Sequence, residues 1–475
     1  MLGASQQHIQ STNQPCLEFS EGTLSLRGCK SEVLRSTYGK SAWEWDSRSQ
    51  SWRAFAMSYS KMAEQLSTQP HSIQDLVPAW QRVNWNNVLL PELRAEQKQA
   101  VEAWSTTRSG VVIMPTGTGK TEVALRIMAD QCCSTLVVAP IRDLMYQWHR
   151  RILAGLQYDC GIIGDNTFNV KPVSVTTYDS ACIHMPALGN RFKLIIFDEC
   201  HHLPGPIRSD AARMSAAPYR LGLTATLDDH DHRSDLIQKL LGPVVYRLGI
   251  EEVKGTTLAD FDIYRIQVKL TEREQHRYDF LASQVSSYVY ERRTEDTEFD
   301  WNQLCKDSSE NPDARRTLKA FREKQSIEDR ADAKLDVIED LLRLHHGTPM
   351  IVFAGSNAMA RDISLRFLIP CLLSQCGKAE RLDYLDGLRD GVYPAIVANQ
   401  ILDEGVDIPA VKIAIVVGGM ASTRQAKQRL GRILRKSGNE RAILYEVVCA
   451  DTNEIARSRK RRKNDAYSRT RNRKN

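Results

Sequence analysis

The stretch that decides the fold runs from Gly110 to Thr121 and reads Gly-Val-Val-Ile-Met-Pro-Thr-Gly-Thr-Gly-Lys-Thr. Its apolar start predicts a short buried strand, and its second half predicts a glycine loop that leads into a helix. Gly117 and Gly119 let the backbone bend so that its N–H groups and the helix N-terminus face phosphates. Met114 stands where the general phosphate-loop pattern has its first glycine, so an ordinary glycine turn is the alternative if this stretch is taken alone.

A second motif, Leu-Ile-Ile-Phe-Asp-Glu-Cys-His, spans Leu194–His201. Its four apolar residues are typical of a strand that is buried on both faces of a sheet, and two adjacent acids end that strand. We expect Asp198 to hold Mg²⁺ through water, and Glu199 to orient and deprotonate an attacking water. Lys120 is expected to contact the β- and γ-phosphates, and the hydroxyl of Thr121 to contact Mg²⁺. Together the two motifs predict an ATP site.

The residues after the acids, Cys200, His201 and His202, raise the alternative of a zinc site. The sequence holds no second ligand cluster of metal spacing, and a carboxylate pair precedes these three residues. The eleven cysteines are scattered and none forms a Cys-x-x-Cys pair. Neither a zinc ribbon nor a disulfide framework is indicated.

Length and composition give broad limits. A chain of 475 residues predicts about three domains, and its 42% hydrophobic content is ordinary for a soluble globular protein. No stretch approaches the roughly 20 apolar residues that cross a bilayer, and the polar N-terminus has no secretory apolar block. We expect a cytoplasmic protein with no membrane partner.

The formal net charge of +6 is unevenly distributed. Residues 456–475 carry ten Lys or Arg and one Asp, a net charge of +9, which leaves −3 for the rest of the chain. This basic tail has almost no apolar residue, so we expect it to be disordered and to bind nucleic-acid phosphates. A solvated end that only promotes solubility is the alternative.

Short apolar runs predict the strands of two successive parallel sheets with crossover helices. The first set is Val111–Met114, Leu136–Ala139, Val173–Thr176, Leu194–Phe197 and Tyr219–Leu223. The second set is Ile263–Leu270, Met350–Phe353, Ala395–Ala398, Ile413–Val417 and Ala442–Val448. The fold class is therefore α/β, with two units in tandem. The expected domains are a disordered N-terminus (1–14), a small module (15–88), two α/β domains (89–248 and 249–455) and the basic tail (456–475).

Two regions depart from the strand pattern. Residues 271–346 are charged, with apolar residues at helical spacing, and predict a helical insertion in the second domain; its middle, 292–312, is polar enough to be mobile. Residues 15–88 predict an α/β or mostly β module that carries Trp43, Trp45 and Trp52. Its aromatic side chains could stack bases, although the core of a small domain uses Trp just as readily.

The order of further motifs resembles the motor of superfamily-two helicases. In the first domain, Leu93–Gln97 resembles the adenine-reading glutamine motif, Ala139–Ile141 with Gln147 and Trp148 resembles motif Ia, and Thr176–Tyr178 resembles the next strand-contacting motif. Leu223–Thr226 resembles the Thr-Ala-Thr coupling motif. In the second domain, Val352–Ala354 resembles motif IV, Asp403–Pro409 motif V and Gln428–Arg435 motif VI. The resemblance implies two RecA-like domains. Because Arg432 and Arg435 are three residues apart, a helix would place both on one face, from which they could reach the γ-phosphate.

The same resemblance assigns roles residue by residue. The nucleotide-binding residues it implies are Gln97, Pro115, Thr116, Gly117, Thr118, Gly119, Lys120, Thr121, Gly405 and Asp407. The catalytic residues are Lys120, Asp198, Glu199, His201, Gln428, Arg432 and Arg435, with Thr121 and Asp198 at Mg²⁺. Thr224 and Thr226 are the coupling residues.

Within the superfamily, the chain looks most like the XPB branch in its short prokaryotic or archaeal form. The similarity rests on Asp198–Pro204, Leu241–Tyr246 and Arg429–Arg435, on Gly22–Gly28, which resembles a damage-recognition module, and on the insertion in the place of a thumb. Where XPB relatives carry Arg-Glu-Asp, this chain has Asp229-His230-Asp231, which removes a charged wedge. Translocation on duplex DNA is thus better supported than unwinding, and 3'-5' movement is what the family implies.

The resemblance predicts an ATP- and Mg²⁺-dependent DNA helicase or translocase that acts as a monomer in DNA repair or remodelling, on single-stranded, duplex or forked DNA. One alternative is an ATP-gated clamp that recruits a nuclease partner. Others are an RNA-remodelling motor and a restriction-type translocase. The Asp-Glu-Cys-His form disfavours the RNA motor, and the lack of a nuclease acid and lysine cluster in the spare sequence disfavours an autonomous restriction enzyme.

Overall fold

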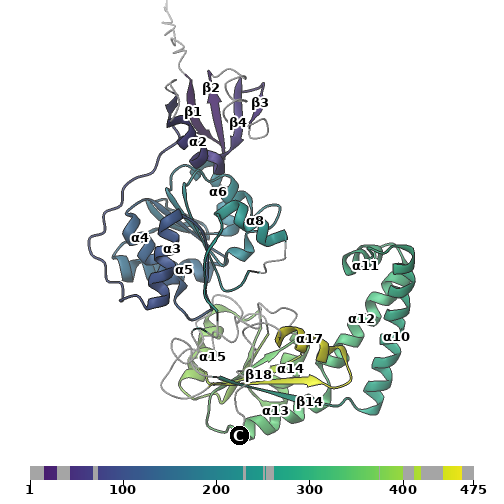
Figure 1. Ribbon diagram of the computed structural model, residues 1–475. Coiled ribbons are helices and arrows are strands. Elements are labelled where there is room, and N and C mark those ends of the chain that lie inside the picture. Colours follow the sequence, from purple (N-terminus) through teal and green to yellow (C-terminus); the bar gives the residue numbers. More distant parts are fainter. Residues whose placement is uncertain are drawn as a thin grey trace, which may run out of the picture. The chain divides into compact units, whose positions relative to one another are not determined.

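The computed structural model describes residues 15–28, 43–67, 73–227, 232–249, 252, 261–373, 375–399, 411–418 and 442–462. These residues divide into two compact units, with the main boundary between Leu248 and Gly249; the loop segment Pro115–Thr118 is grouped with the second unit (Figure 1). The segments predicted as motifs V and VI, 403–409 and 428–435, lie outside the described residues, as does Asp229-His230-Asp231. Among the described helices, none is both long and apolar enough to cross a bilayer.

The N-terminal part of the first unit is mostly β. Its sheet has the order β3-β4-β2-β1-β5, from β1 (Cys16–Ser20), β2 (Thr23–Arg27), β3 (Glu44–Asp46), β4 (Ser51–Phe55) and β5 (Gln74–Asp75), and α2 (Tyr59–Ser67) follows β4. Leu17, Leu24 and Leu26 form its core. Of its tryptophans, Trp43 is buried, as expected of a core residue, whereas Trp45 is 49% exposed and packs edge-on against Trp52.

The rest of the first unit is built around one sheet of eight strands in the order β13-β6-β12-β11-β7-β10-β8-β9. The strands are β6 (Ser109–Ile113), β7 (Thr135–Ala139), β8 (Gly161–Gly164), β9 (Thr167–Phe168), β10 (Val173–Thr177), β11 (Leu194–Asp198), β12 (Tyr219–Thr224) and β13 (Val244–Arg247). All pairs are parallel except β8 with β9. The five predicted strands occupy the five adjacent positions from β6 to β10.

Helices cover both faces of this sheet (Figure 1). Helices α3 (Ala95–Thr107), α4 (Lys120–Gln131) and α5 (Arg142–Leu156) lie on one face, and α6 (Tyr178–Leu188) and α8 (His232–Leu241) on the other. The short helix α7 (Asp210–Arg213) contacts α6 and α8. The two faces explain why the central strands are continuous apolar runs: β7 and β11 are buried at every position.

The second unit has a six-stranded parallel sheet in the order β14-β19-β18-β15-β17-β16. Its strands are β14 (Phe261–Val268), β15 (Met350–Ala354), β16 (Cys371–Leu372), β17 (Ala395–Ala398), β18 (Ile413–Val417) and β19 (Ala442–Cys449), with helices α14 (Asn357–Phe367) and α15 (Lys378–Arg389). The predicted two-unit parallel architecture is therefore confirmed.

The predicted helical insertion consists of α10 (Glu272–Glu295), α11 (Trp301–Asp307), α12 (Pro312–Asp329) and α13 (Asp332–Leu344). Thr271 and Glu274 form a capping box that starts α10. Helices α10 and α12 run side by side out to α11 (Figure 1). The stretch expected to be mobile, 292–312, instead contains α11, because Phe299 and Leu304 are buried against Ala314 and Tyr288.

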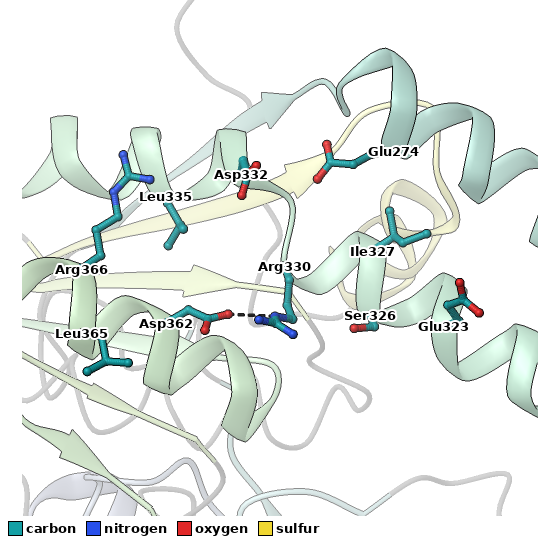
Figure 2. Close-up of a pocket in the computed structure, with 10 residues that line it drawn as sticks. All are labelled: Glu274, Glu323, Ser326, Ile327, Arg330, Asp332, Leu335, Asp362, Leu365 and Arg366. Atoms are coloured by element: carbon teal, nitrogen blue, oxygen red, sulfur yellow. Dashed lines mark hydrogen bonds and ion pairs between the residues drawn. The ribbon is translucent and has the colours of Figure 1, made fainter.

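An open groove lies at the root of the insertion (Figure 2). Glu274 of α10 and Ile327 of α12 line it on one side, and Asp362 and Leu365 of α14 on the other. Arg330 Nε donates to Asp362 Oδ2 at 2.8 Å and so ties the insertion to the sheet domain.

The prediction that disorder begins at residue 456 needs correction. Helix α17 (Asn453–Arg462) continues through the first seven residues of the basic tail. Arg457 pairs with Glu328, and the hydroxyl of Ser458 donates to Glu446 Oε2 at 2.7 Å. These buried acids neutralise part of the basic run, which charge counting alone does not reveal. Residues 463–475 lie outside the described residues.

Candidate active site

The glycine loop follows β6 and ends where α4 begins at Lys120. Gly117 and Gly119 have φ angles of 90° and 83°, in the left-handed region that favours glycine. A Cβ atom at Gly119 would lie 2.3 Å from Nε2 of Gln97, so only glycine fits against that amide. Lys120 Nζ folds back and donates to the carbonyl of Met114 at 3.2 Å. The loop is thus a close-fitting backbone cradle at a helix N-terminus, the geometry that binds phosphates.

Gln97 has a second contact that fixes its position. Its Oε1 accepts a hydrogen bond from the backbone N–H of Arg94 at 2.9 Å, in a capping box at the start of α3. The side chain is 3% exposed. The amide predicted to read adenine therefore lies against the glycine loop and is held there by α3.

Asp198 ends β11 at the carboxyl edge of the sheet, and both of its oxygens accept hydrogen bonds. Trp148 Nε1 donates to Oδ2 at 2.8 Å, and the backbone N–H of Glu199 donates to Oδ1 at 3.0 Å. Tyr178 Oη donates to the Asp198 carbonyl at 3.1 Å. Burial, and secondarily the neighbouring Glu199 carboxylate, raise the pKa of Asp198 to about 6, whereas the Trp148 hydrogen bond acts to lower it.

Glu199 has a φ of 47°, a left-handed conformation that is uncommon for a residue other than glycine. Its Oε1 lies 3.9 Å from Lys120 Nζ. Its Oε2 lies 3.4 Å from His201 Nδ1 and is buried without a hydrogen bond. The strained turn thus directs a carboxylate with an unsatisfied oxygen toward the loop lysine.

A hydroxyl on the adjacent strand joins this cluster. Thr224 Oγ1 lies 3.0 Å from His201 Nδ1 and donates to the carbonyl of Thr226 at 3.0 Å. Because the hydroxyl proton is used on Thr226, Thr224 Oγ1 accepts the proton of His201 Nδ1. The carbonyl of Thr224 accepts from the N–H of Met114 at 3.0 Å. The glycine loop, the acid motif and the Thr-Ala-Thr motif are therefore in one bonded network.

The structure brings together five of the predicted site residues: Lys120, Asp198, Glu199, His201 and Thr224. Thr121 lies in the first turn of α4, and Pro115, Thr116 and Thr118 lie in the loop before it. Five other predicted site residues lie outside the described residues: Gly405, Asp407, Gln428, Arg432 and Arg435.

The sequence resemblance placed Trp148 in motif Ia and Tyr178 in the next strand-contacting motif, but it did not identify them as the two side chains that hold Asp198. The sequence held one indication of this contact. Both residues follow predicted strands whose carboxyl ends lie at the same edge of the sheet as Asp198. Cys200 is fully buried, and that burial raises the pKa of its thiol, which opposes thiolate formation at a zinc site. In the part of the chain that is described, no group of three or more His, Cys, Asp or Glu side chains could hold a metal.

Comparisons with known proteins match both units. Residues 90–229 match the family described as type III restriction enzyme, res subunit, and residues 316–466 match the ERCC3/RAD25/XPB C-terminal helicase family. The chain is 41% identical over 372 residues to the DNA 3'-5' translocase XPB2 of Sulfurisphaera tokodaii, an alignment that covers 78% of this chain and 84% of that relative. The chain belongs to the XPB family.

Other XPB relatives are longer. The chain is 28% identical over 376 residues to the DNA 3'-5' helicase XPB of Kineococcus radiotolerans, covering 76% of this chain and 60% of that relative. Two solved structures, the Pyrococcus furiosus Hef helicase domain and Saccharomyces cerevisiae Dbp5 bound to RNA and ADP BeF3, match 78% of this chain with TM-scores of 0.50 and 0.53. The alignments cover 98% and 87% of those chains, and at 16% identity they show a shared fold alone.

Proposed function

We propose that this XPB-family chain is an ATP-dependent DNA translocase of 3'-5' polarity. The observation that carries the proposal is the chain of close contacts from Lys120 through Glu199 and His201 to Thr224, in which Glu199 lies 3.9 Å from Lys120 and 3.4 Å from His201, and His201 is hydrogen-bonded to Thr224. These contacts link the proposed phosphate-binding lysine, Lys120, and the proposed water-activating acid, Glu199, to the end of β12, where the coupling motif starts at Thr224. The names of the relatives, a DNA 3'-5' translocase and a DNA 3'-5' helicase, supply the substrate and the direction.

The residues present fit ATP with Mg²⁺. The glycine loop leads into the N-terminus of α4, with Gly119 so close to Gln97 that a Cβ would collide with its amide, and Glu199 Oε2 is a buried acceptor without a donor. Asp198 and the Thr121 hydroxyl supply the hard oxygen donors that Mg²⁺ prefers. When bound, the cation would neutralise phosphate charge and polarise the bond to the γ-phosphate.

The side chains divide the remaining work. Lys120 leaves the Met114 carbonyl to contact the phosphates, and Glu199 accepts a proton from the attacking water. His201 packs against Glu199, with Nδ1 3.4 Å from Oε2, while its Nδ1 proton is bonded to Thr224, so a movement of Thr224 would change the surroundings of Glu199. The resemblance assigns catalytic roles to Gln428, Arg432 and Arg435 and nucleotide binding to Gly405 and Asp407, all of which lie outside the described residues. Nucleic acid would be held mainly through its phosphates.

Translocation is preferred over strand separation for two reasons. The Sulfurisphaera relative, at 41% identity, is named a translocase. In addition, Asp229-His230-Asp231 lacks the arginine and glutamate of the wedge that the family resemblance implies. Action in DNA repair or remodelling, as a monomeric motor, is part of the same proposal.

The test is steady-state ATP hydrolysis by the wild type, Lys120→Ala and Glu199→Gln, with single-stranded, duplex or forked DNA, with RNA, and without nucleic acid. We expect DNA to stimulate the wild type and both variants to lose turnover, with ATP binding retained by Glu199→Gln. Displacement of a triplex-forming strand then separates translocation from unwinding of a fork. Stimulation by RNA alone would refute the DNA assignment, and turnover independent of any nucleic acid would favour an ATP-gated clamp for a nuclease partner.

A further inference from the structure

An exposed aromatic side chain marks a groove that the ATP site does not use. Phe168 in β9 is 59% exposed, and its ring lies 4.8 Å from the ring of His184 on α6. Ile183, the residue before His184, is 71% exposed. These side chains line an open groove of about 850 Å³. Exposed apolar groups gathered in one hollow are a feature of interaction sites.

The groove is formed by the carboxyl ends of β7 and β10 and by the β8–β9 hairpin. Its walls include Ile141, directly after β7, and Thr177, at the end of β10. Ligands of parallel α/β sheets bind at this edge. The same two segments are those whose sequence resembles the strand-contacting motifs, so the groove adjoins the expected path of nucleic acid.

The hairpin that carries Phe168 is firmly held. Asp165 and Asn166 both have positive φ, 52° and 59°, as a two-residue hairpin turn requires. The Asp165 carboxylate is bound to α5 by Arg142 Nη1 at 2.7 Å and by Tyr146 Oη at 2.8 Å. The exposed ring therefore stands on a fixed support, and a ligand that stacks on it need not order the hairpin first.

The charges in the groove favour bases over phosphates. Three carboxylates line it: Asp143, Asp165 and Asp179. Arg142 pairs with Asp165, and Arg208 Nε lies 3.2 Å from Asp179 Oδ1, so the local charge is largely balanced. The groove therefore has little net positive charge to attract phosphates, whereas its carboxylates can accept hydrogen bonds from the exocyclic amino groups of bases. An aromatic ring with paired acids around it matches an unstacked base.

We propose that this groove is a base-stacking platform, on which an unpaired base of DNA stacks against Phe168 with His184 supporting the ring. The inference rests on the proposed DNA-translocase function and adds to it a preference for DNA that has an unpaired segment. Stacking on an aromatic ring contributes about 1–3 kcal/mol per base, roughly fivefold to 150-fold in affinity.

The experiment compares binding of forked and blunt duplex DNA by the full chain carrying Phe168→Leu or Phe168→Trp. Leucine keeps the apolar character and loses the π face, whereas tryptophan keeps the π face. We expect Phe168→Leu to weaken forked-DNA binding at least fivefold, to leave blunt-duplex binding unchanged and to preserve the dependence of affinity on salt. Phe168→Trp should bind forked DNA like the wild type. The matched control is Leu153→Ala, which removes an exposed apolar side chain of α5 that does not line the groove.

A second readout is direct. The fluorescence of 2-aminopurine placed in the unpaired arm of the fork should be quenched when the DNA binds the wild type or Phe168→Trp. Quenching should be weaker with Phe168→Leu. If Phe168→Leu binds forked DNA as tightly as the wild type does, the base-stacking proposal is wrong and the translocase proposal is unaffected. An equal loss on forked and blunt DNA would also overturn it. Absence of any DNA binding by the wild type would instead refute the proposed function.

Discussion

Thr224 Oγ1 lies 3.0 Å from His201 Nδ1, and the exposed fractions of the two side chains are 0% and 9%. The contact crosses from β12 to the turn after β11, and His201 also lies 3.4 Å from Glu199 Oε2. Through these two contacts the end of β12 adjoins the carboxylate that faces Lys120. If Thr224 and Glu199 have the coupling and hydrolytic roles proposed for them, this is a short route by which each could influence the other.

Thr224→Val should uncouple hydrolysis from DNA. Valine keeps the β-branched shape but leaves His201 Nδ1 without its acceptor, so Glu199 loses a fixed neighbour. We expect DNA-stimulated turnover to fall about tenfold, equivalent to about 1.4 kcal/mol, with nucleotide affinity unchanged. The measurement is ATP hydrolysis against DNA concentration, together with binding of a fluorescent nucleotide. Thr106→Val on the exposed face of α3 is the matched control, and full DNA stimulation in Thr224→Val would contradict the assigned coupling.

The central strands could be predicted from sequence because their burial on both faces leaves a continuous apolar run, as in β7 and β11. The two edge strands of the eight-stranded sheet, β9 and β13, could not be predicted in this way. β9 has two residues, both exposed, and β13 is only half-buried, so neither carries a periodic apolar signal. An edge strand is specified by pairing with its neighbour more than by its own sequence.

The site shows the same division. Lys120, Asp198 and Glu199 are recognisable because their chemistry requires a fixed local spacing. Trp148 and Tyr178 reach Asp198 only because the sheet order places β11 beside β7, with β10 next to β7, and that order brings together residues 50 and 20 positions apart in sequence. Local pattern carries no information about strand order, so such supporting side chains require the fold.

Breaking the buried ion pair of the second unit should be strongly destabilising. Lys334 Nζ lies 2.8 Å from Glu454 Oε2, and the side chains are 0% and 1% exposed. Glu454→Gln leaves a buried ammonium without its counter-charge, so we expect a loss of about 3–5 kcal/mol. Urea unfolding followed by hydrogen exchange in α13 and α17 measures it. Asp386→Asn, in the exposed pair with Arg389, should cost less than about 1 kcal/mol, and equal costs for the two variants would refute the argument.

Ionisation of the buried Asp329 carboxyl group should make the second unit less stable as pH rises. Burial raises the pKa of Asp329 from 3.8 to about 6. The folded state therefore binds this proton more tightly than the unfolded state. The resulting stability is complete below pH 3.8 and is lost as pH rises through about 6.

Asp329→Asn removes that titration. The variant should be more stable than the wild type by about 2–3 kcal/mol at pH 8, with the difference shrinking toward pH 4. Thermal unfolding of both proteins across this range provides the comparison. A difference that does not change with pH would show that the carboxyl group is not the cause.

Only the part of the basic tail beyond α17 can be deleted without removing contacts to the folded second unit. Deleting residues 456–475 would remove Arg457 and Ser458, leaving the fully buried carboxylate of Glu328 without its cation, so weaker DNA binding could reflect damage to the fold. Deleting only 463–475 removes five Lys or Arg and one Asp and leaves α17 whole.

If the tail binds phosphates, this deletion should lower the affinity for duplex DNA at low salt. The slope of log affinity against log salt concentration should decrease by about 0.9 for each phosphate that the tail had neutralised. Unstimulated ATP hydrolysis should not change. Affinity and slope equal to those of the full chain would assign the tail to solubility or to binding another protein.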